Sequence, residues 1–527
     1  MYRRHEAPAR LLVGYDPVTD LPSDHLARLV EMVVEESVIV KARKPQAGQP
    51  KFDPRLCLKV LVYGYATGVR SSRQLEKQCK ESLPYLFLTR GDTPSYRTLC
   101  SFRIESKDLL SQVWLGLFGV AKNLGLKRLG RIVMDSTKLR ANTSSEMILA
   151  RDEYAGVKLE LQRILDEAEA KDKQEDAEGY AGETRTGTDV GNLQMRDILR
   201  KVRRQLSKHS EPDPTHESGA KGGAVEIDRR VFKSRKGLTA RMKDRLKDAG
   251  KSIAEAESDG RQHLCLTDPD ARMMHGGVEK RIRECHSLEV AVDKDCGLLV
   301  ADGVTQIGND NERLVPLVEA AETNEPEGIK AVDTDSGYFQ ADAVADLARR
   351  GIDTCIPDST TACELHRGMA IGTLARRRLV LLEYDEQRDA YLCPEGNELT
   401  LRRPKKGDAD NIKRYRSIRM CIGCPRYNEC IVRLDGKPAK AEYKWIQVRQ
   451  RSPEIRSMME RFNEPEYRQR YNERGGFVEG VHGFVRSALG FDRWLLRGKD
   501  KVQSEGKLIT TAYQFRKLHL CWAGTMA

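Results

Sequence analysis

RIVMDSTK, residues 131–138, is the stretch of sequence that decides the fold. Its first residues form a short apolar run rich in β-branched side chains, which predicts a strand that ends in Asp135. A second run of this kind, residues 329–332, leads into DTDSGY, residues 333–338. Because neighbouring strands can end at a common edge of a sheet, we expect Asp135 and Asp335 to lie close together.

The sequence around these two strands predicts a mixed sheet. Residues 286–306 have the pattern of a hairpin with its turn at 293–297, and residues 353–357 form a further short strand. Residues 313–323 and 341–349 have apolar side chains at helical spacing. The order β, ββ, α, β, α, β predicts an α/β fold with helices on both faces of the sheet, provided that residues 145–285 are an insertion.

A length of 527 residues suggests more than one structural unit. We therefore divide the chain into consecutive segments. They are an N-terminal arm and helix (1–50), a helical domain (51–128), the core (129–144 and 286–360), a charged helical insertion (145–285), a cysteine-containing insertion (361–465) and a C-terminal helix with a basic tail (466–527).

Charge is concentrated in two segments of a chain whose net charge is +11. Residues 55–130 contain 13 Lys and Arg against 5 Asp and Glu, and residues 467–527 contain 11 against 5. Such basic segments favour a polyanionic partner such as nucleic acid, although a generally basic surface would give the same count.

The composition also excludes several classes of protein. No stretch approaches 18 uncharged apolar residues, so we expect no membrane span. The N-terminus lacks the apolar core of a signal peptide, and the 13 cysteines are an odd number without a repeating framework. We therefore expect a cytoplasmic protein with reduced cysteines.

The basic segment near the N-terminus has the features of a helix-turn-helix. Helices are predicted over 72–81 and 95–104, and Pro94 lies close to the start of the second helix. The second helix would present Arg97 and Arg103 to DNA phosphates or base edges. The alternative is a helical subdomain with ordinary solvated basic faces.

A third carboxylate comes from the C-terminal segment. In GFVEGVHGFVR, residues 476–486, a helix would place Glu479, His482 and Arg486 on one face. Asp135, Asp335 and Glu479 together would suit Mg²⁺ or Mn²⁺, which prefer oxygen ligands. Each acidic residue taken singly is also compatible with a structural role at a strand end or on a solvated helix.

Four cysteines form a second candidate site. Cys421 and Cys424 have the spacing of a zinc knuckle, and Cys430 and Cys393 supply two further thiolates for a tetrahedral Zn²⁺. His366 is an alternative to Cys393. A set of free thiols is the other interpretation.

The ordered set of motifs resembles the DDE transposases of bacterial insertion sequences. The resemblance runs over residues 50–520. It rests on DSTK (135–138), TDPDAR (267–272), DSGYF (335–339), Glu479 with Arg486 seven residues later, and the C-terminal run from Arg497 to Tyr513. It implies an RNase H-like core with two bound Mg²⁺ or Mn²⁺ ions, held by Asp135, Asp335 and Glu479.

The resemblance also bears on individual residues. Asp333 is the register alternative to Asp335, which is preferred because Ser-Gly-Tyr follows it directly. Relatives carry Tyr-x2-Arg-x3-Glu, whereas here Glu479 lies one residue further from Tyr471 and Arg474 than that pattern requires. Residues expected to contact DNA are Arg97, Arg103, Lys138, Arg474, His482, Arg486 and Arg497. Trp494 would stack on a displaced base or belong to the core.

The function expected from this set is that of a DNA transposase. It would bind the terminal inverted repeats of its element, cut with a metal-activated water and join the new 3′-hydroxyl to target DNA. The resemblance implies a homodimer at double-stranded DNA in the bacterial nucleoid. The alternatives are a DNA-binding protein that has lost catalysis and an RNase H-like nuclease.

Overall fold

The computed structural model describes residues 16–40, 51–177, 195–210, 240–276, 281–308, 310–325, 327–373, 381–402, 412–431, 440–449 and 451–526. The first part of the predicted N-terminal arm, residues 1–15, lies outside these ranges. Within them, no helix is both long enough and apolar enough to cross a membrane.

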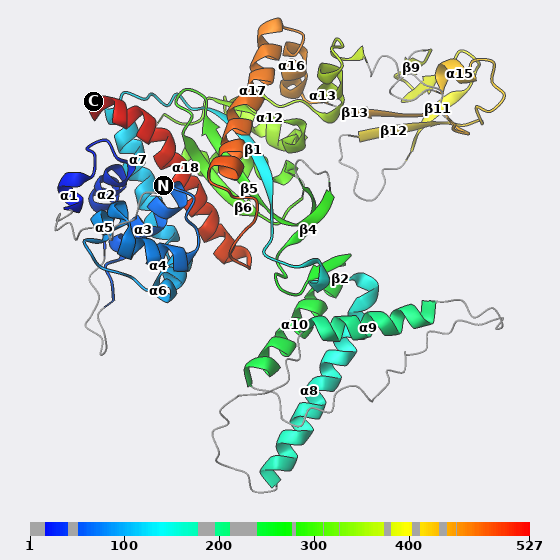
Figure 1. Ribbon diagram of the computed structural model, residues 1–527. Helices are drawn as coiled ribbons and strands as arrows, with labels where there is room; N and C mark the ends of the chain where they lie inside the picture. Colours follow the sequence, from blue (N-terminus) through cyan, green and yellow to red (C-terminus); the bar gives the residue numbers. More distant parts are fainter. Residues whose placement is uncertain are drawn as a thin grey trace, which may run out of the picture.

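A mixed sheet forms the centre of the molecule (Figure 1). Its strands run in the order β6–β5–β1–β7–β8, and β4 pairs with the first part of β5. β1 is antiparallel to β5 and parallel to β7, which is in turn parallel to β8. The bounds are β1 (Arg131–Arg140), β4 (Arg272–Gly276), β5 (Arg281–Asp293), β6 (Leu299–Thr305), β7 (Ala331–Asp333) and β8 (Asp353–Cys355).

These strands confirm the mixed α/β prediction and correct two boundaries. β1 runs to Arg140, so it continues past Asp135, where the strand was predicted to end. The predicted turn at 293–297 separates β5 from β6. However, β5 begins at Arg281, earlier than the predicted start at residue 286, and β4 lies wholly within the segment taken as an insertion. The charged residues of this stretch, which include Arg281, Arg283 and Glu284, hide its strand pattern.

Side chains of β1 alternate between two cores. Ile132 and Met134 pack in a core that includes residues of α11 (Leu314–Glu322), α12 (Ala341–Arg349) and α16 (Pro453–Arg461). Val133 and Leu139 belong to the other core, to which α17 (Pro465–Gly483) and α18 (Lys499–Met526) contribute. Helices therefore cover both faces of the sheet.

The N-terminal helices pack against the sheet through α18. The predicted helices are confirmed as α2 (Leu26–Ser37), α3 (Pro54–Ala66), α4 (Ser72–Glu81), α6 (Tyr96–Glu105) and α7 (Lys107–Asn123), after a short α1 (Pro17–Asp20). An unpredicted helix, α5 (Leu83–Thr89), lies between α4 and α6. The predicted two-helix motif is therefore a three-helix arrangement.

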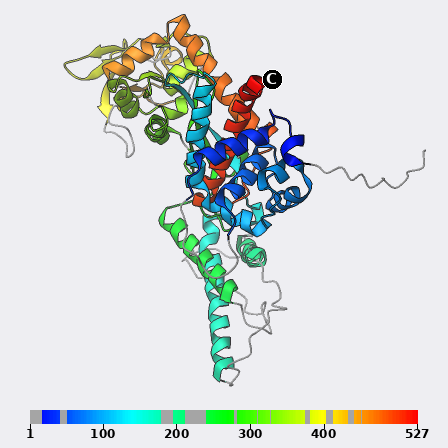
Figure 2. The same ribbon diagram turned by 90° about the vertical axis from the view of Figure 1, so that its left-hand side faces the viewer.

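Two further units project from the core in different directions (Figures 1 and 2). One contains α8 (Tyr154–Ala177), α9 (Met195–Ser210) and α10 (Ala240–Ser258), with a small sheet of β2 (Ile148–Ala150) and β3 (His263–Cys265). The first two helices were predicted as a pair, and α10 completes their apolar cluster.

The other projecting unit is an antiparallel sheet that the sequence did not predict. Its order is β13–β12–β11–β10–β9, around a small core. The bounds are β9 (Glu383–Asp385), β10 (Ala390–Leu392), β11 (Glu398–Arg402), β12 (Ile412–Ser417) and β13 (Trp445–Arg449), with the short α15 (Tyr427–Cys430) beside them. α13 (Ser359–His366) precedes this unit and α16 follows it.

Candidate active site

Asp135 and Asp335 occupy matching positions on neighbouring strands. Val133 of β1 is in register with Asp333 of β7, and each aspartate lies two residues beyond this pair. Asp335 follows the end of β7 and accepts a hydrogen bond from the Gly337 amide at 2.9 Å. The parallel pairing therefore brings both carboxylates to one edge of the sheet, as the sequence predicts.

The two carboxylates differ in their electrostatic surroundings. Burial raises the pKa of Asp335, and the nearby Asp135 carboxylate raises it further. Burial also acts to raise the pKa of Asp135, but its contacts with His482, the Ser136 amide and Arg474 outweigh this and lower it. Because two neighbouring carboxylates repel each other, a cation between them would be stabilising.

Asp333, the register alternative, has other partners. Its side chain is 1% exposed and forms ion pairs with Lys294 at 3.1 Å and Arg470 at 2.5 Å. Arg470 also pairs with Asp353 of β8. Asp333 therefore links β7 to α17, which leaves Asp335 as the carboxylate beside Asp135.

α17 carries Glu479 three residues before His482. The helix continues through Gly475 and Gly476. His482, one turn after Glu479, places its Nε2 3.6 Å from Oδ2 of Asp135. Glu479 itself is exposed, and its Oε1 turns back toward Gly475.

The three acidic residues are not drawn together as a compact cluster. Over the described ranges, no group of three or more His, Cys, Asp or Glu is arranged closely enough to hold a metal ion. Asp135 and Asp335 are close neighbours, whereas Glu479 stands one helical turn from the residue that contacts Asp135. A short π-helix, η5 (Phe484–Ala488), follows directly, a feature often found at functional sites.

Arg474 is the basic residue of this edge. Its guanidinium lies close enough to Asp135 and Asp335 to lower the pKa of both, and it is stacked 5.0 Å from the ring centre of Tyr471. Its buried Nε has no hydrogen-bond partner in the described part of the chain. Tyr471 and Arg474 therefore reach the site although Glu479 lies one residue off the expected spacing.

Lys138 and Arg486, both expected to contact DNA, have partners inside the protein. Lys138 Nζ lies 3.0 Å from Asp310, and Arg486 donates to Thr137 Oγ1 at 2.6 Å and to the Lys138 carbonyl at 3.1 Å. A DNA contact by either residue would require these bonds to be given up.

Sequence reasoning missed Asp310. Its carboxylate accepts hydrogen bonds from Ser136 and Lys138 of β1, and it contributes to the raised pKa of Asp335. Tyr338 is buried between these acids; burial and then Asp310 raise its pKa well above the usual value. The turn-forming run GNDN, residues 308–311, was the available signal.

Burial decides the roles of Arg103, a predicted DNA contact, and of Trp494, for which a base contact and a place in the core were both open. Arg103 is 4% exposed and donates to the Arg70 carbonyl and Ser72 Oγ, so it belongs to the helical core. Trp494 is 1% exposed and its Nε1 lies 3.4 Å from the His286 carbonyl, so it cannot stack on a base. Arg97 of α6 is exposed.

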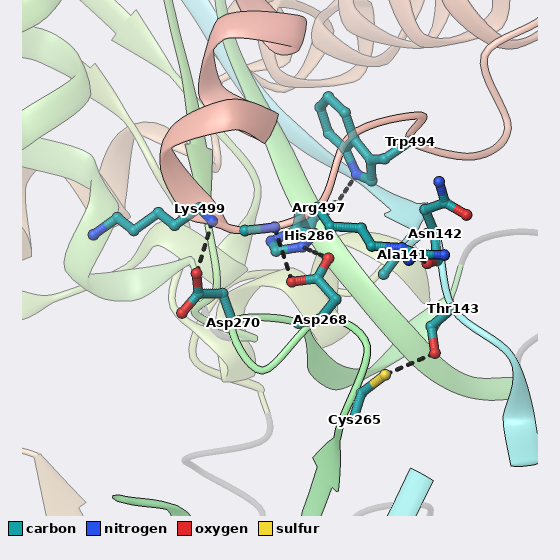
Figure 3. A network of polar contacts seen from close by, with 12 residues as sticks. Ala141, Asn142, Thr143, Cys265, Asp268, Asp270, His286, Trp494, Arg497 and Lys499 are labelled. Atoms are coloured by element: carbon teal, nitrogen blue, oxygen red, sulfur yellow. Dashed lines mark hydrogen bonds and ion pairs between the residues drawn. The ribbon is translucent and has the colours of Figure 1, made fainter. Parts of the chain in front are cut away.

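The TDPDAR segment holds the loop before α18 (Figure 3). Buried Asp268 contacts His286 at 2.9 Å and accepts a hydrogen bond from the Gly498 amide at 3.1 Å. Asp270 accepts from the Lys499 amide, and Arg497 donates to the Asn142 carbonyl while remaining exposed. These contacts tie the loop to the end of β1 and indicate a structural role.

The four predicted zinc ligands line one cavity of about 320 Å³ in the projecting sheet. Burial raises the pKa of Cys430, and Cys393 and Cys421 lie near enough to add to this. His366, the alternative ligand, is on α13 and does not line the cavity. The donor set fits Zn²⁺ in kind, although the thiols are not at ligand distances.

An acidic sheet edge faced by a basic helix defines a candidate phosphoryl-transfer site. Two family models match the chain: Transposase domain (DUF772) over residues 17–105 and Transposase DDE domain over residues 392–519. No curated protein and no solved structure matches it.

The first match covers α1 to α6, and the second runs from β10 into α18 and includes Glu479. Together the two matches support a DDE transposase of insertion-sequence type. The two domains indicate a transposase and imply that it binds DNA.

Proposed function

We propose that this protein cuts the ends of its own element and joins them to target DNA, with Asp135, Asp335 and Glu479 as its catalytic carboxylates. The observation that carries the proposal is the meeting of Asp135 and Asp335 at one sheet edge, with the Glu479 helix in contact through His482. The strand order β6–β5–β1–β7–β8, antiparallel and then parallel, supports an RNase H-like core.

The donor chemistry of the edge fits Mg²⁺ or Mn²⁺. Asp135 and Asp335 supply opposed carboxylates, and Glu479 would complete the set when its side chain turns from Gly475 toward the edge. Held by these carboxylates, two divalent ions would supply Lewis-acid chemistry to the attacking and leaving oxygens.

The residues of the chain would orient the DNA for two in-line steps. In the first, water attacks the phosphorus and the 3′-oxygen leaves as a hydroxyl. In the second, that hydroxyl attacks a target phosphodiester and displaces a target 3′-oxygen. Arg474 and His482, both beside the carboxylates, are placed to hold the scissile phosphate.

The test is cleavage of a duplex that carries the element end. Asp135→Ala, Asp335→Ala and Glu479→Ala should each abolish nicking and leave end binding within about twofold. Asp342→Ala, at an exposed aspartate of α12, is the matched control and should cut normally. Normal nicking by all three variants would disprove the assignment.

Two other activities remain alternatives to be separated by the same assay. Binding without nicking would indicate a DNA-binding protein that has lost catalysis. Nicking without joining to a target duplex would indicate a nuclease. We further propose that two copies act together, because two ends must be joined; a single copy at paired ends would argue against this.

A further inference from the structure

The projecting β9–β13 sheet displays a tryptophan that the catalytic proposal does not use. The chain has four tryptophans, of which Trp114, Trp494 and Trp522 are buried. Trp445, the first residue of β13, is 50% exposed. An aromatic side chain of this size left half in water marks a candidate contact surface.

Trp445 forms part of a cross-strand row with basic character. Thr400, Arg416 and Trp445 are directly paired across β11, β12 and β13. The Arg416 guanidinium lies 3.8 Å from the ring centre of Tyr443 and 5.4 Å from that of Trp445. Stacking of this kind holds the arginine flat against the rings without neutralising its charge.

The next row extends the same face of the sheet. It contains Arg402, Arg414 and Gln447. In the described part of the chain, neither Arg402 nor Arg416 forms a salt bridge. The opposite face carries the small core of Tyr391, Leu399, Tyr415 and Ile446, so the face with Trp445 points away from it.

We propose that this face binds unpaired nucleotides of a DNA strand; it is called the Trp445 face and is defined by Trp445, Arg416, Arg402 and Gln447. Trp445 would stack on a base, and the arginines would contact the phosphates that flank it. The proposal rests on the proposed function and extends it, because strand cleavage leaves a free strand end whose last bases can separate from the complementary strand.

The chemistry of the face favours this partner over others. A duplex keeps its base faces stacked and offers Trp445 nothing but its sugar–phosphate surface. An apolar protein surface would bury the charge of Arg416 and Arg402 without a counter-charge, which is costly. A single strand offers both an exposed π-face and phosphates.

The test uses the full chain and a fluorescein-labelled 20-nucleotide single strand in buffer without Mg²⁺ or Mn²⁺. Trp445→Ala should weaken binding about tenfold. Arg416→Ala should weaken it and reduce the slope of log affinity against log salt by about 0.7. Arg388→Ala, at an exposed arginine in the β9–β10 turn of the same unit, is the control and should bind normally.

A spectroscopic signal separates stacking from a loss of folding. Since Trp445 is the exposed tryptophan, saturating DNA should quench part of the intrinsic fluorescence. Trp445→Phe keeps an aromatic ring and should retain most of the affinity but lose that quench. Because the buffer contains no Mg²⁺ or Mn²⁺, the result does not depend on whether Asp135, Asp335 and Glu479 cut DNA.

Three results would overturn the proposal. The first is single-strand affinity of Trp445→Ala within twofold of the parent protein. The second is an equal loss for a 20-base-pair duplex, which would assign the face to the phosphate backbone. The third is an altered oligomeric state with unchanged DNA affinity, which would assign it to a protein contact.

Discussion

Charged side chains have different surroundings in the core sheet and in the β9–β13 sheet. In the core sheet, charges on the strands are tied to other elements, as Asp333 is to Lys294 and Arg470. In the β9–β13 sheet, Arg416 lies on the rings of Tyr443 and Trp445 and keeps its charge available. The first arrangement fixes a geometry, whereas the second presents a surface.

The same contrast appears within the core sheet, between two aspartates on one segment. Asp333 is buried and paired with two cations, while Asp335 is held near Asp135 and carries a raised pKa. Loss of one partner from a buried ion pair destabilises the fold. Two neighbouring carboxylates repel each other, and this repulsion lasts until a cation binds between them. This difference separates a structural residue from a candidate catalytic one.

Replacement of Asp333 should have the largest effect on stability. Asp333→Ala leaves Arg470 and Lys294 without their buried partner, at a cost of about 3–5 kcal/mol in the free energy of unfolding. Asp335→Ala should change that energy by less than about 1 kcal/mol without metal. Urea unfolding followed by circular dichroism measures both, and equal losses would erase the distinction.

Zinc should matter to the β9–β13 sheet and leave the core sheet unaffected. We expect about one Zn²⁺ per chain, with the thiolates as ligands, and loss of that metal in Cys421→Ser and Cys424→Ser. Metal analysis of the purified protein checks this. Cys100→Ser and Cys521→Ser, at exposed thiols, are controls. Metal-free parent protein with an unchanged melting profile would contradict the prediction.

A buried acid away from the catalytic edge should make stability depend on pH. Burial raises the pKa of Glu325 to about 7, and Arg128, at 3.8 Å, only partly offsets this. The neutral form is therefore favoured in the folded state, so stability falls as the pH rises through 7. The side chain introduced by Glu325→Gln cannot ionise, so the urea midpoint of this variant should change less with pH between 5.5 and 8. An unchanged dependence of the midpoint on pH would contradict the role of Glu325.

The smallest effect is expected at α6. Arg97→Ala removes one exposed charge and should weaken duplex binding on the order of twofold to fivefold, with a salt slope lower by about 0.9. Arg103→Ala should instead destabilise the protein by about 1.5–3 kcal/mol, because its buried hydrogen bonds are lost. Fluorescence anisotropy measures the DNA affinity of both variants, and urea unfolding measures their stability. A stability loss in Arg97→Ala with weakened DNA binding alone in Arg103→Ala would contradict both roles.

Local patterns predicted much of the core sheet. The apolar runs before Asp135 and Asp335 became β1 and β7, and the turn after Asp293 separates two strands. The β9–β13 sheet was missed because strands such as KRYRS, residues 413–417, are highly charged and half exposed. A small sheet with a minor core leaves little apolar alternation to detect.

The sequence predicted which residues belong to the candidate site better than it predicted which residues they contact. Asp135 and Asp335 are neighbours, but the contacts of His482 with Asp135 and of Asp310 with Ser136 join residues far apart in sequence. Arg103 was assigned to DNA as a basic residue of the second predicted helix, and tertiary packing buried it. Trp494 was left open between a base contact and the core, and it lies in the core. Exposure is set by the whole fold, so a basic or aromatic residue alone does not reveal it.

Manganese binding to the protein tests the central claim most directly. Titration of Mn²⁺ followed by electron paramagnetic resonance should show tight binding in the parent protein with bound end DNA. Asp135→Asn, Asp335→Asn and Glu479→Gln should each weaken that binding at least tenfold, because all three carboxylates would hold the ions. Parent-like Mn²⁺ affinity in Glu479→Gln, together with its loss in Asp135→Asn, would contradict the shared site.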